Sequence, residues 1–231
     1  YHNYDPDTAR EVYGEALEVL LEGMTSITLS YEGRHFNYNE VPMELHPLQD
    51  PHPPIWYPSS NPGGSAYAGE NGFHYCTLGG IDAAKESIAA YREAYAKRGT
   101  PLGPERPFLG GTAIGISRQV TVAETDEDAL KIAGPAFKVW HASLTKLWRE
   151  NQVEGPVFAR NTVDTVEKAM AGGAHIAGSP ETVTELLAEQ IDTLGVNYMV
   201  IAFNIGNMAH EDAMRSITMF GEEVMPKLQS L

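Results

Sequence analysis

A short loop of small and polar residues is the part of the sequence best suited to bind a phosphate group. It reads Ser59-Ser60-Asn61-Pro62-Gly63-Gly64-Ser65 and leads into a predicted short helix that ends near Asn71. Free N–H groups at a helix start, with hydroxyls beside them, are a typical anion-binding arrangement. The same residues also suit a plain surface turn, because glycine and proline favour turn geometry. The residues alone leave both interpretations open.

A second polar loop follows the last predicted strand. It contains Asn204 and Asn207, and His210 begins the predicted helix after it. Asparagine amides can hydrogen-bond the polar edge of a ligand. A turn followed by a helix cap explains the same residues at least as well, so this loop is a weaker candidate.

The sequence contains no other familiar catalytic pattern. No pair among the eight histidines has metal-ligand spacing with a nearby carboxylate, and we therefore expect no metal. The Gly-x-Ser-x-Gly pattern of a hydrolase nucleophile is absent from the sequence. Catalytic residues consequently stay unassigned at this point.

Predicted helices and apolar strands alternate along the chain, which favours parallel strands joined by crossover helices. A hairpin is expected at 28–38, and residues 151–178 are expected to be irregular within an insertion over 124–178. Pro135 is expected to interrupt the helix that begins after Thr125. Strands are predicted at 55–57, 73–78, 112–122 and 198–203, and helices at 6–23, 82–98, from 125, 179–194 and from 210. A closed barrel and an open, Rossmann-like sheet both fit this order, although no G-x-G-x-x-G follows any strand.

Composition excludes several classes of protein. The 231 residues include 31 acidic and 16 basic side chains, a net charge of -15 that repels nucleic acid. No apolar run approaches the ~18 residues of a membrane span. The single cysteine, Cys76, fits a reducing compartment, and we expect a cytoplasmic protein whose buried thiol is inert.

Several segments resemble the bacterial-luciferase-like flavin monooxygenases. The proline-rich connector is the most specific of them when it is taken together with the later Gly-Ser-Pro-Glu-Thr-Val helix start. The segments are Glu15–Leu20, Tyr31–Phe36, Pro47–Gln49, Pro51–Trp56, Ala68–Phe73 and Gly178–Val183. The resemblance implies one (β/α)8 TIM-barrel domain over residues 1–231, containing strands 5–8 and lacking the first strands.

The resemblance also implies a function. It points to a monooxygenase that uses reduced FMN and O2 on a small organic substrate, with a separate flavin reductase as the supplier and a homo-oligomeric assembly. The phosphate is expected on the first loop, at Ser59, Ser60, Asn61, Gly64 and Ser65. Two alternatives stay open: a hydride-transferring oxidoreductase that depends on the deazaflavin F420, and a non-catalytic partial barrel that binds flavin.

Overall fold

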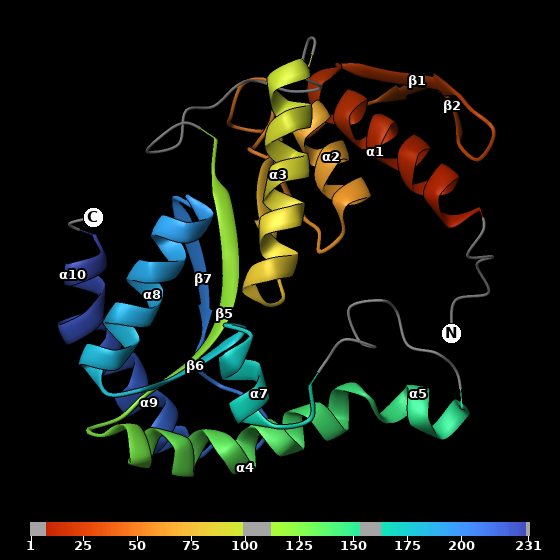
Figure 1. Cartoon of the computed structure of the whole chain (residues 1–231). Coiled ribbons are helices and arrows are strands. Elements are labelled where there is room, and N and C mark those ends of the chain that lie inside the picture. Colours follow the sequence, from red (N-terminus) through yellow and green to blue (C-terminus); the bar gives the residue numbers. More distant parts are fainter. Residues whose placement is uncertain (1–7, 99–111, 153–162, 230–231) are drawn as a thin grey trace. The chain divides into compact units, whose positions relative to one another are not determined.

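The computed structural model describes residues 8–98, 112–152 and 163–229, which belong to two compact units (Figure 1). The smaller unit comprises Tyr1–Ile55 and Gly99–Arg106, and the larger comprises Trp56–Arg98 and Pro107–Leu231. Each unit is described by itself. Whether residues 1–231 form a single barrel domain, as the resemblance implies, stays a prediction.

The smaller unit pairs one helix with the expected hairpin. Helix α1 (Ala9–Thr25) precedes strands β1 (Thr28–Glu32) and β2 (Asn37–Pro42), which are antiparallel. The predicted helix start at Asp5 and Pro6 lies outside the described residues. Thr8 is the N-cap residue, but its side chain makes no capping hydrogen bond.

Acidic side chains along one face of α1 hold the hairpin. The Tyr31 hydroxyl donates to Glu18 Oε2 at 2.7 Å, and Arg34 Nη1 lies 2.7 Å from Glu11 Oε1. Between them, Glu15 accepts hydrogen bonds from the backbone N–H groups of the hairpin turn at residues 34–36. The glutamates of α1 therefore join the helix to the hairpin within this unit.

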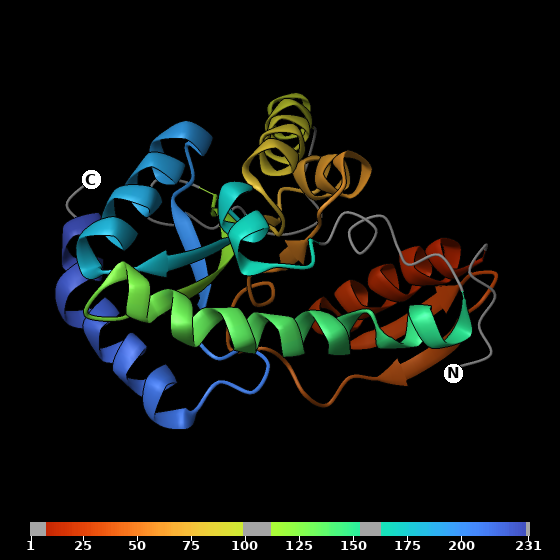
Figure 2. The ribbon, with the colours of Figure 1, turned by 60° about the horizontal axis from the view of Figure 1, so that its bottom comes forward.

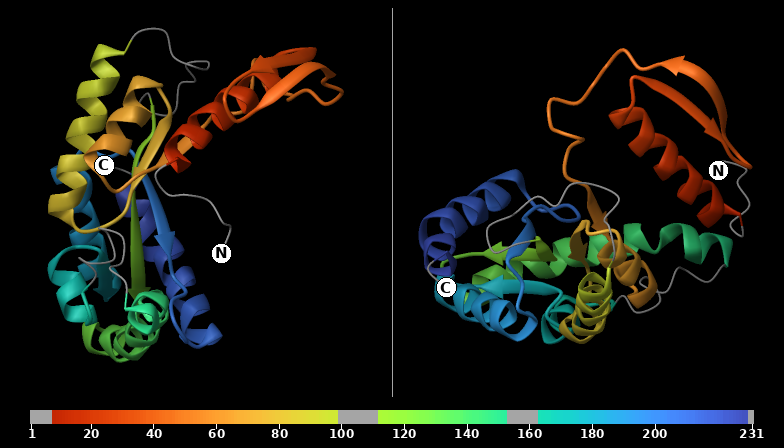
Figure 3. Two further views of the ribbon diagram at one scale, coloured as in Figure 1. Left: turned by 90° about the vertical axis from the view of Figure 1, so that its right-hand side faces the viewer. Right: turned by 90° about the horizontal axis from the view of Figure 1, so that it is seen from above.

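The larger unit is a parallel sheet flanked by helices, as Figures 2 and 3 show. Neighbouring strands run in the order β3-β4-β5-β6, and β7 also pairs with β5. The strands are β3 (Trp56–Pro58), β4 (His74–Thr77), β5 (Ile114–Val122), β6 (His175–Gly178) and β7 (Tyr198–Ala202). The helices are α2 (Pro62–Glu70), α3 (Ile81–Lys97), α4 (Asp126–Leu144), α5 (Lys146–Asn151), α7 (Val166–Ala171), α8 (Pro180–Leu194) and α9 (His210–Met219), followed by the π-helical turn η1 (Phe220–Val224) and α10 (Met225–Leu228).

Successive positions along one face of the central strand β5 pack against different helices. Ile116 packs with Ile88 of α3, whereas Val120 and Val122 pack with Leu187 of α8. A third apolar cluster joins α4 and α7 to the loop after β7 through Phe137, Val166 and Ile205. Burial of these side chains is the main favourable contribution to the stability of the unit.

Three local predictions differ from the structure. The stretch predicted as irregular contains α7 and the short strand β6, and whether 124–178 is an insertion stays a prediction. Helix α4 continues through Pro135, because its apolar face is buried on both sides of the proline. The sequence predicts a buried stripe of Met214, Ile217, Gly221 and Val224 along the last helix, which is wrong in part. Val224 is buried, but in α9 Ala213 and Ser216 are buried while Met214 and Ile217 are exposed.

No helix among the described residues is long and apolar enough to cross a membrane.

Candidate functional site

The predicted phosphate-binding loop joins the carboxyl end of β3 to the start of α2. Asn61 is the N-cap residue, and its Oδ1 atom accepts a hydrogen bond from the Gly64 N–H at 2.9 Å. Pro62 occupies the first helical position, where its missing N–H costs no hydrogen bond. The helix start that the sequence predicted is therefore present, with asparagine as its cap.

Two serines of the loop are turned into the protein. The hydroxyl of Ser65 donates to the Asn61 carbonyl at 2.7 Å and lies 2.7 Å from the Tyr75 hydroxyl, which itself donates to the Ser59 carbonyl at 2.9 Å. Ser65 is fully buried and Ser59 nearly so. Both residues thus hold the loop on β4, and their direct contact with a ligand stays a prediction.

Ser60 connects the loop to the neighbouring strand. Its Oγ accepts a hydrogen bond from the Leu78 N–H at 3.3 Å, one residue beyond the end of β4. The ends of β3 and β4 pair at Pro58 and Cys76, so Ser60 and Leu78 extend this pairing into the loops. The loop after β3 is consequently held against the turn that begins α3.

The surface that remains for a ligand is made of backbone N–H groups and small side chains. The N–H groups of Ser60 and Gly63 have no hydrogen-bond partner among the described residues, and Asn61 is exposed. A Cβ atom on Gly64 would lie 2.4 Å from Ser59 Oγ and would displace that side chain, whereas one on Gly63 would only touch Asn61 Oδ1 at 3.5 Å. Ser60, Asn61 and Gly63 therefore form the accessible part of the loop.

The charge around this helix start distinguishes it from the others. Among the helices of at least eight residues that the structure describes, α2 alone has no acidic residue in its first turn. The start of α8 already receives a carboxylate, since Asp126 Oδ1 accepts the Ser179 N–H at 2.7 Å, which lowers the pKa of Asp126. In a chain of net charge -15, α2 is, among these longer described helices, the start at which a bound anion meets least repulsion from its own helix.

The second candidate loop has a packing role. Ile205 is buried, and Gly206 has a φ of +55°, so close to α4 that a Cβ atom there would lie 2.0 Å from the Ala136 carbonyl oxygen. Asn204, Asn207 and His210 are exposed and lie at the carboxyl end of β7. The loop is thus fixed by its contact with α4 and exposes both amides.

Aromatic side chains gather at the opposite ends of the strands. Trp56 at the start of β3 packs on His74 and Tyr198, with ring centroids 4.9 and 4.8 Å away. His74 Nδ1 accepts the Ala113 N–H at 3.1 Å, and burial lowers its pKa. These groups belong to the amino ends of the strands, away from the α2 start.

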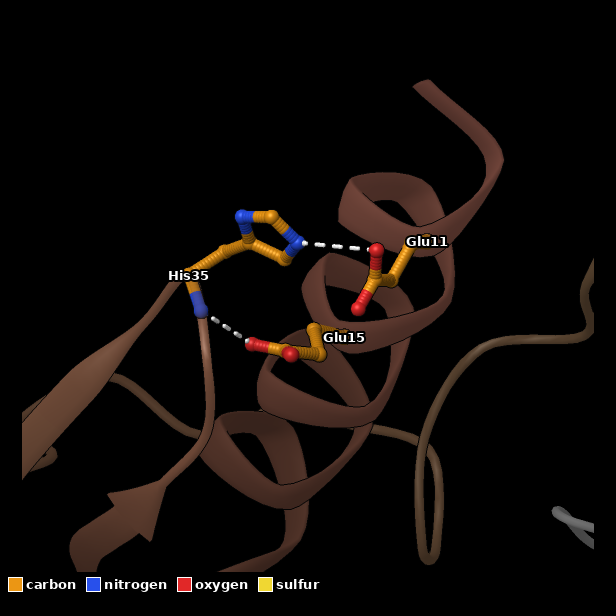
Figure 4. Close-up of side chains that lie close together, drawn as sticks. All are labelled: Glu11, Glu15 and His35. Carbon is orange, nitrogen blue, oxygen red and sulfur yellow. Dashed lines mark hydrogen bonds and ion pairs between the residues drawn. The ribbon is translucent and has the colours of Figure 1, made fainter. Parts of the chain in front are cut away.

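One cluster in the smaller unit has the composition of a metal site. Glu11, Glu15 and His35 bring their ligand atoms within 4.8 Å of one another (Figure 4). Both carboxylates are already engaged: Arg34 lowers the pKa of Glu11, and the His35 backbone N–H lowers that of Glu15. We therefore attribute this cluster to the packing of the hairpin on α1 and infer no metal there.

Comparison with known proteins decides the family. A family model described as luciferase-like monooxygenase matches residues 1–198. The chain belongs to this family. Among curated relatives, the uncharacterized proteins y4wF and y4vJ of Sinorhizobium fredii are 27% and 21% identical to it over 228 and 230 residues. These matches cover 99% and 96% of this chain but 64% and 63% of the relatives, so it spans less than two thirds of their length.

Solved structures confirm the luciferase-like TIM-barrel fold, of which this chain forms a part. The monooxygenase RslO1 from Streptomyces bottropensis superimposes with a TM-score of 0.70 at 18% identity, over 96% of this chain and 62% of that one. The oxygenating constituent of 3,6-diketocamphane monooxygenase from Pseudomonas putida, in complex with FMN, gives 0.65 at 21% identity, over 94% and 63%. A coenzyme F420-dependent reductase from Methanopyrus kandleri gives 0.63 at 16% identity, over 94% and 62%.

Proposed function

We propose that this chain takes part in a flavin-dependent oxidoreductase that uses reduced FMN and O2 on a small organic substrate. The observation that supports this most directly is the start of α2, at the carboxyl end of β3, where active sites of TIM barrels lie. It combines unpartnered N–H groups with a first turn free of acidic residues. Family membership supplies the class of reaction, and the loop supplies the phosphate site.

The residues present fit the phosphate end of such a cofactor. The N–H groups of Ser60 and Gly63 would donate to phosphate oxygens, and the Asn61 side chain orients the helix start by accepting the Gly64 N–H. Glycine at 63 and 64 lets the ligand approach the backbone closely. The flavin ring supplies the redox chemistry when it is bound, and the protein contributes binding, orientation and exclusion of water.

The deazaflavin alternative rests on the structural comparisons. Two of the similar structures are described as F420-dependent, a tetrahydromethanopterin reductase and a secondary alcohol dehydrogenase in complex with an F420–acetone adduct. Both cofactors carry phosphate, so the α2 start suits either one. A partial barrel that binds flavin without catalysis is the remaining alternative.

Further proposals follow from the family membership. We propose a separate reductase as the supplier of reduced flavin and a homo-oligomeric assembly. Strands β3, β6 and β7 each pair with a single strand among the described residues, and such edges favour association. The single cysteine supports a cytoplasmic location.

Anaerobic titration of the purified chain with FMN, reduced FMN and F420 tests the proposal. We expect saturable binding of reduced FMN, followed by absorbance, and a new spectral species on admission of O2. Binding of F420 without FMN binding would favour the hydride-transfer alternative. Binding of FMN without any reaction with O2 would favour the non-catalytic one, and binding of none of them would overturn the proposal for this chain.

A further inference from the structure

A buried arginine in the middle of β5 has no ionic partner in the part of the chain that the structure describes. Arg118 is 1% exposed, and the neighbouring residues on the same face of the strand, Ile116 and Val120, are apolar. No carboxylate of the described residues contributes to its electrostatic environment, and Nη2 has no hydrogen-bond partner among them. A buried guanidinium without a counter-ion is costly, and an aliphatic side chain would fill such a position more favourably.

The Arg118 guanidinium donates hydrogen bonds to backbone carbonyl groups, one of which belongs to the turn after β4. Arg118 Nη1 donates to the Gly79 carbonyl at 2.9 Å and to the Ser117 carbonyl at 2.8 Å, while Nε donates to Gln190 Oε1 at 2.6 Å. Burial lowers the pKa of Arg118 to about 10, so the group stays charged at neutral pH. Gly79 follows β4 and has a φ of +96°, a conformation that favours glycine.

The same network holds the turn from its other side. Gln190 Nε2 donates to the Gly173 carbonyl at 3.1 Å, and the preceding carbonyl, that of Gly172, accepts the Ile81 N–H at 2.9 Å. Gly80 lies between these contacts, where a Cβ atom would meet the Gly172 oxygen at 2.5 Å. Arg118 and Gln190 therefore fix the Leu78–Ile81 turn between β5, α8 and the turn before β6.

This turn contacts the proposed phosphate loop directly. The N–H of Leu78, the residue before Gly79, donates to Ser60 Oγ. We infer that Arg118 is a positioning residue, which holds the Gly79 carbonyl and thereby orients Ser60 and the start of α2 for the cofactor phosphate. The inference rests on the proposed function for the identity of the ligand, but the mechanical link from Arg118 to Ser60 is independent of it.

The test compares Arg118→Met with Arg92→Met. Arg92 also donates to a backbone carbonyl, that of Gly195 at 2.7 Å, but at the end of α8 before β7 begins. Hydrogen–deuterium exchange without cofactor provides the first measurement. In R118M we expect peptides covering 78–81 and 59–65 to exchange roughly tenfold faster, because the turn loses the charged hydrogen bond to the Gly79 carbonyl, while peptides of α4 are unchanged. R92M should leave both loops unchanged.

Cofactor affinity provides the second measurement. FMN should bind roughly tenfold more weakly to R118M, while riboflavin, which lacks the phosphate, changes little. If R118M does not fold, Arg118→Lys replaces it: it retains the charge but loses the planar fork, and intermediate values are expected. Faster exchange spread evenly over the larger unit, or loops that stay unchanged, would overturn the inference. If the unaltered chain binds no FMN, the proposed function fails, and the exchange measurement still decides the role of Arg118.

Discussion

At the scale of single residues, the sequence predicts which side chains can form hydrogen bonds, but it does not predict whether those side chains point to solvent or into the protein. Serine and asparagine at 59–65 were recognised as polar partners for an anion. That Ser65 is buried against the Tyr75 hydroxyl depends on contact between α2 and β4, which residue types do not reveal. The burial of Arg118 is even less predictable, because arginine is rarely fully buried. Its position in a strand does not indicate which groups it contacts.

His175 gives a prediction about pH at this scale. Its Nδ1 lies 3.3 Å from Gln119 Oε1, the Phe137 ring packs edge-on against it, and burial lowers its pKa to about 4. The unfolded chain takes up a proton near pH 6.5, which the folded protein does not accept until about pH 4. The free energy of unfolding should therefore fall as pH decreases through this window, by on the order of 2 kcal/mol between pH 7.5 and 5.

Urea unfolding at both pH values checks this prediction. In His175→Gln the residue cannot titrate. Between pH 7.5 and 5, the free energy of unfolding of this variant should therefore fall by on the order of 2 kcal/mol less than that of the unaltered chain. His210→Gln, which replaces an exposed histidine, serves as the control and should behave as the unaltered chain does. An identical loss of stability in all three proteins would show that His175 does not control the acid response.

At the scale of elements, helix ends were predictable because capping is local. Thr125, Ser179 and Gly195 mark helix boundaries in the structure as they do in the sequence. Strand β6 was missed because it is short, shows no alternation and follows a glycine-rich turn. The exposure of Met214 and Ile217 was also missed, since the contact of α9 with β5 uses small residues such as Ser216, whose hydroxyl accepts the Val122 N–H.

The close contact between the loop after β7 and α4 should make Gly206 intolerant of a larger side chain. Gly206→Ala would place a methyl group on the Ala136 carbonyl at a positive φ, and the free energy of unfolding should fall by roughly 2–4 kcal/mol. Gly134→Ala in α4 is the matched control, because its Cβ would meet only Val166 at 3.9 Å. There the helix propensity of alanine should raise stability by about 0.5–1 kcal/mol. Chemical denaturation of both variants measures the two effects, and equal signs would contradict the packing described.

At the scale of the whole molecule, the order of elements predicted parallel strands but left barrel and open sheet undecided. The resemblance of particular segments pointed to the barrel, and the family match with the similar structures confirms it. The chain covers 62% to 64% of the relatives and solved structures whose coverage is given above. The central claim therefore concerns the part of the site that this chain contains, the start of α2.

The most direct test of that claim is the affinity of Gly63→Asp for FMN and for riboflavin, measured by flavin fluorescence. An aspartate in the first turn stabilises the helix and fits beside Asn61, but it repels a phosphate bound at the same N–H groups. We predict that FMN binding weakens roughly tenfold or more. Riboflavin binding should change little. The neutral control Gly63→Asn adds the same bulk without the charge and should weaken FMN binding clearly less than G63D does, and the thermal stability of G63D should stay the same or rise. If FMN binds G63D as tightly as it binds the unaltered chain, the phosphate does not lie at the start of α2 and the account is wrong.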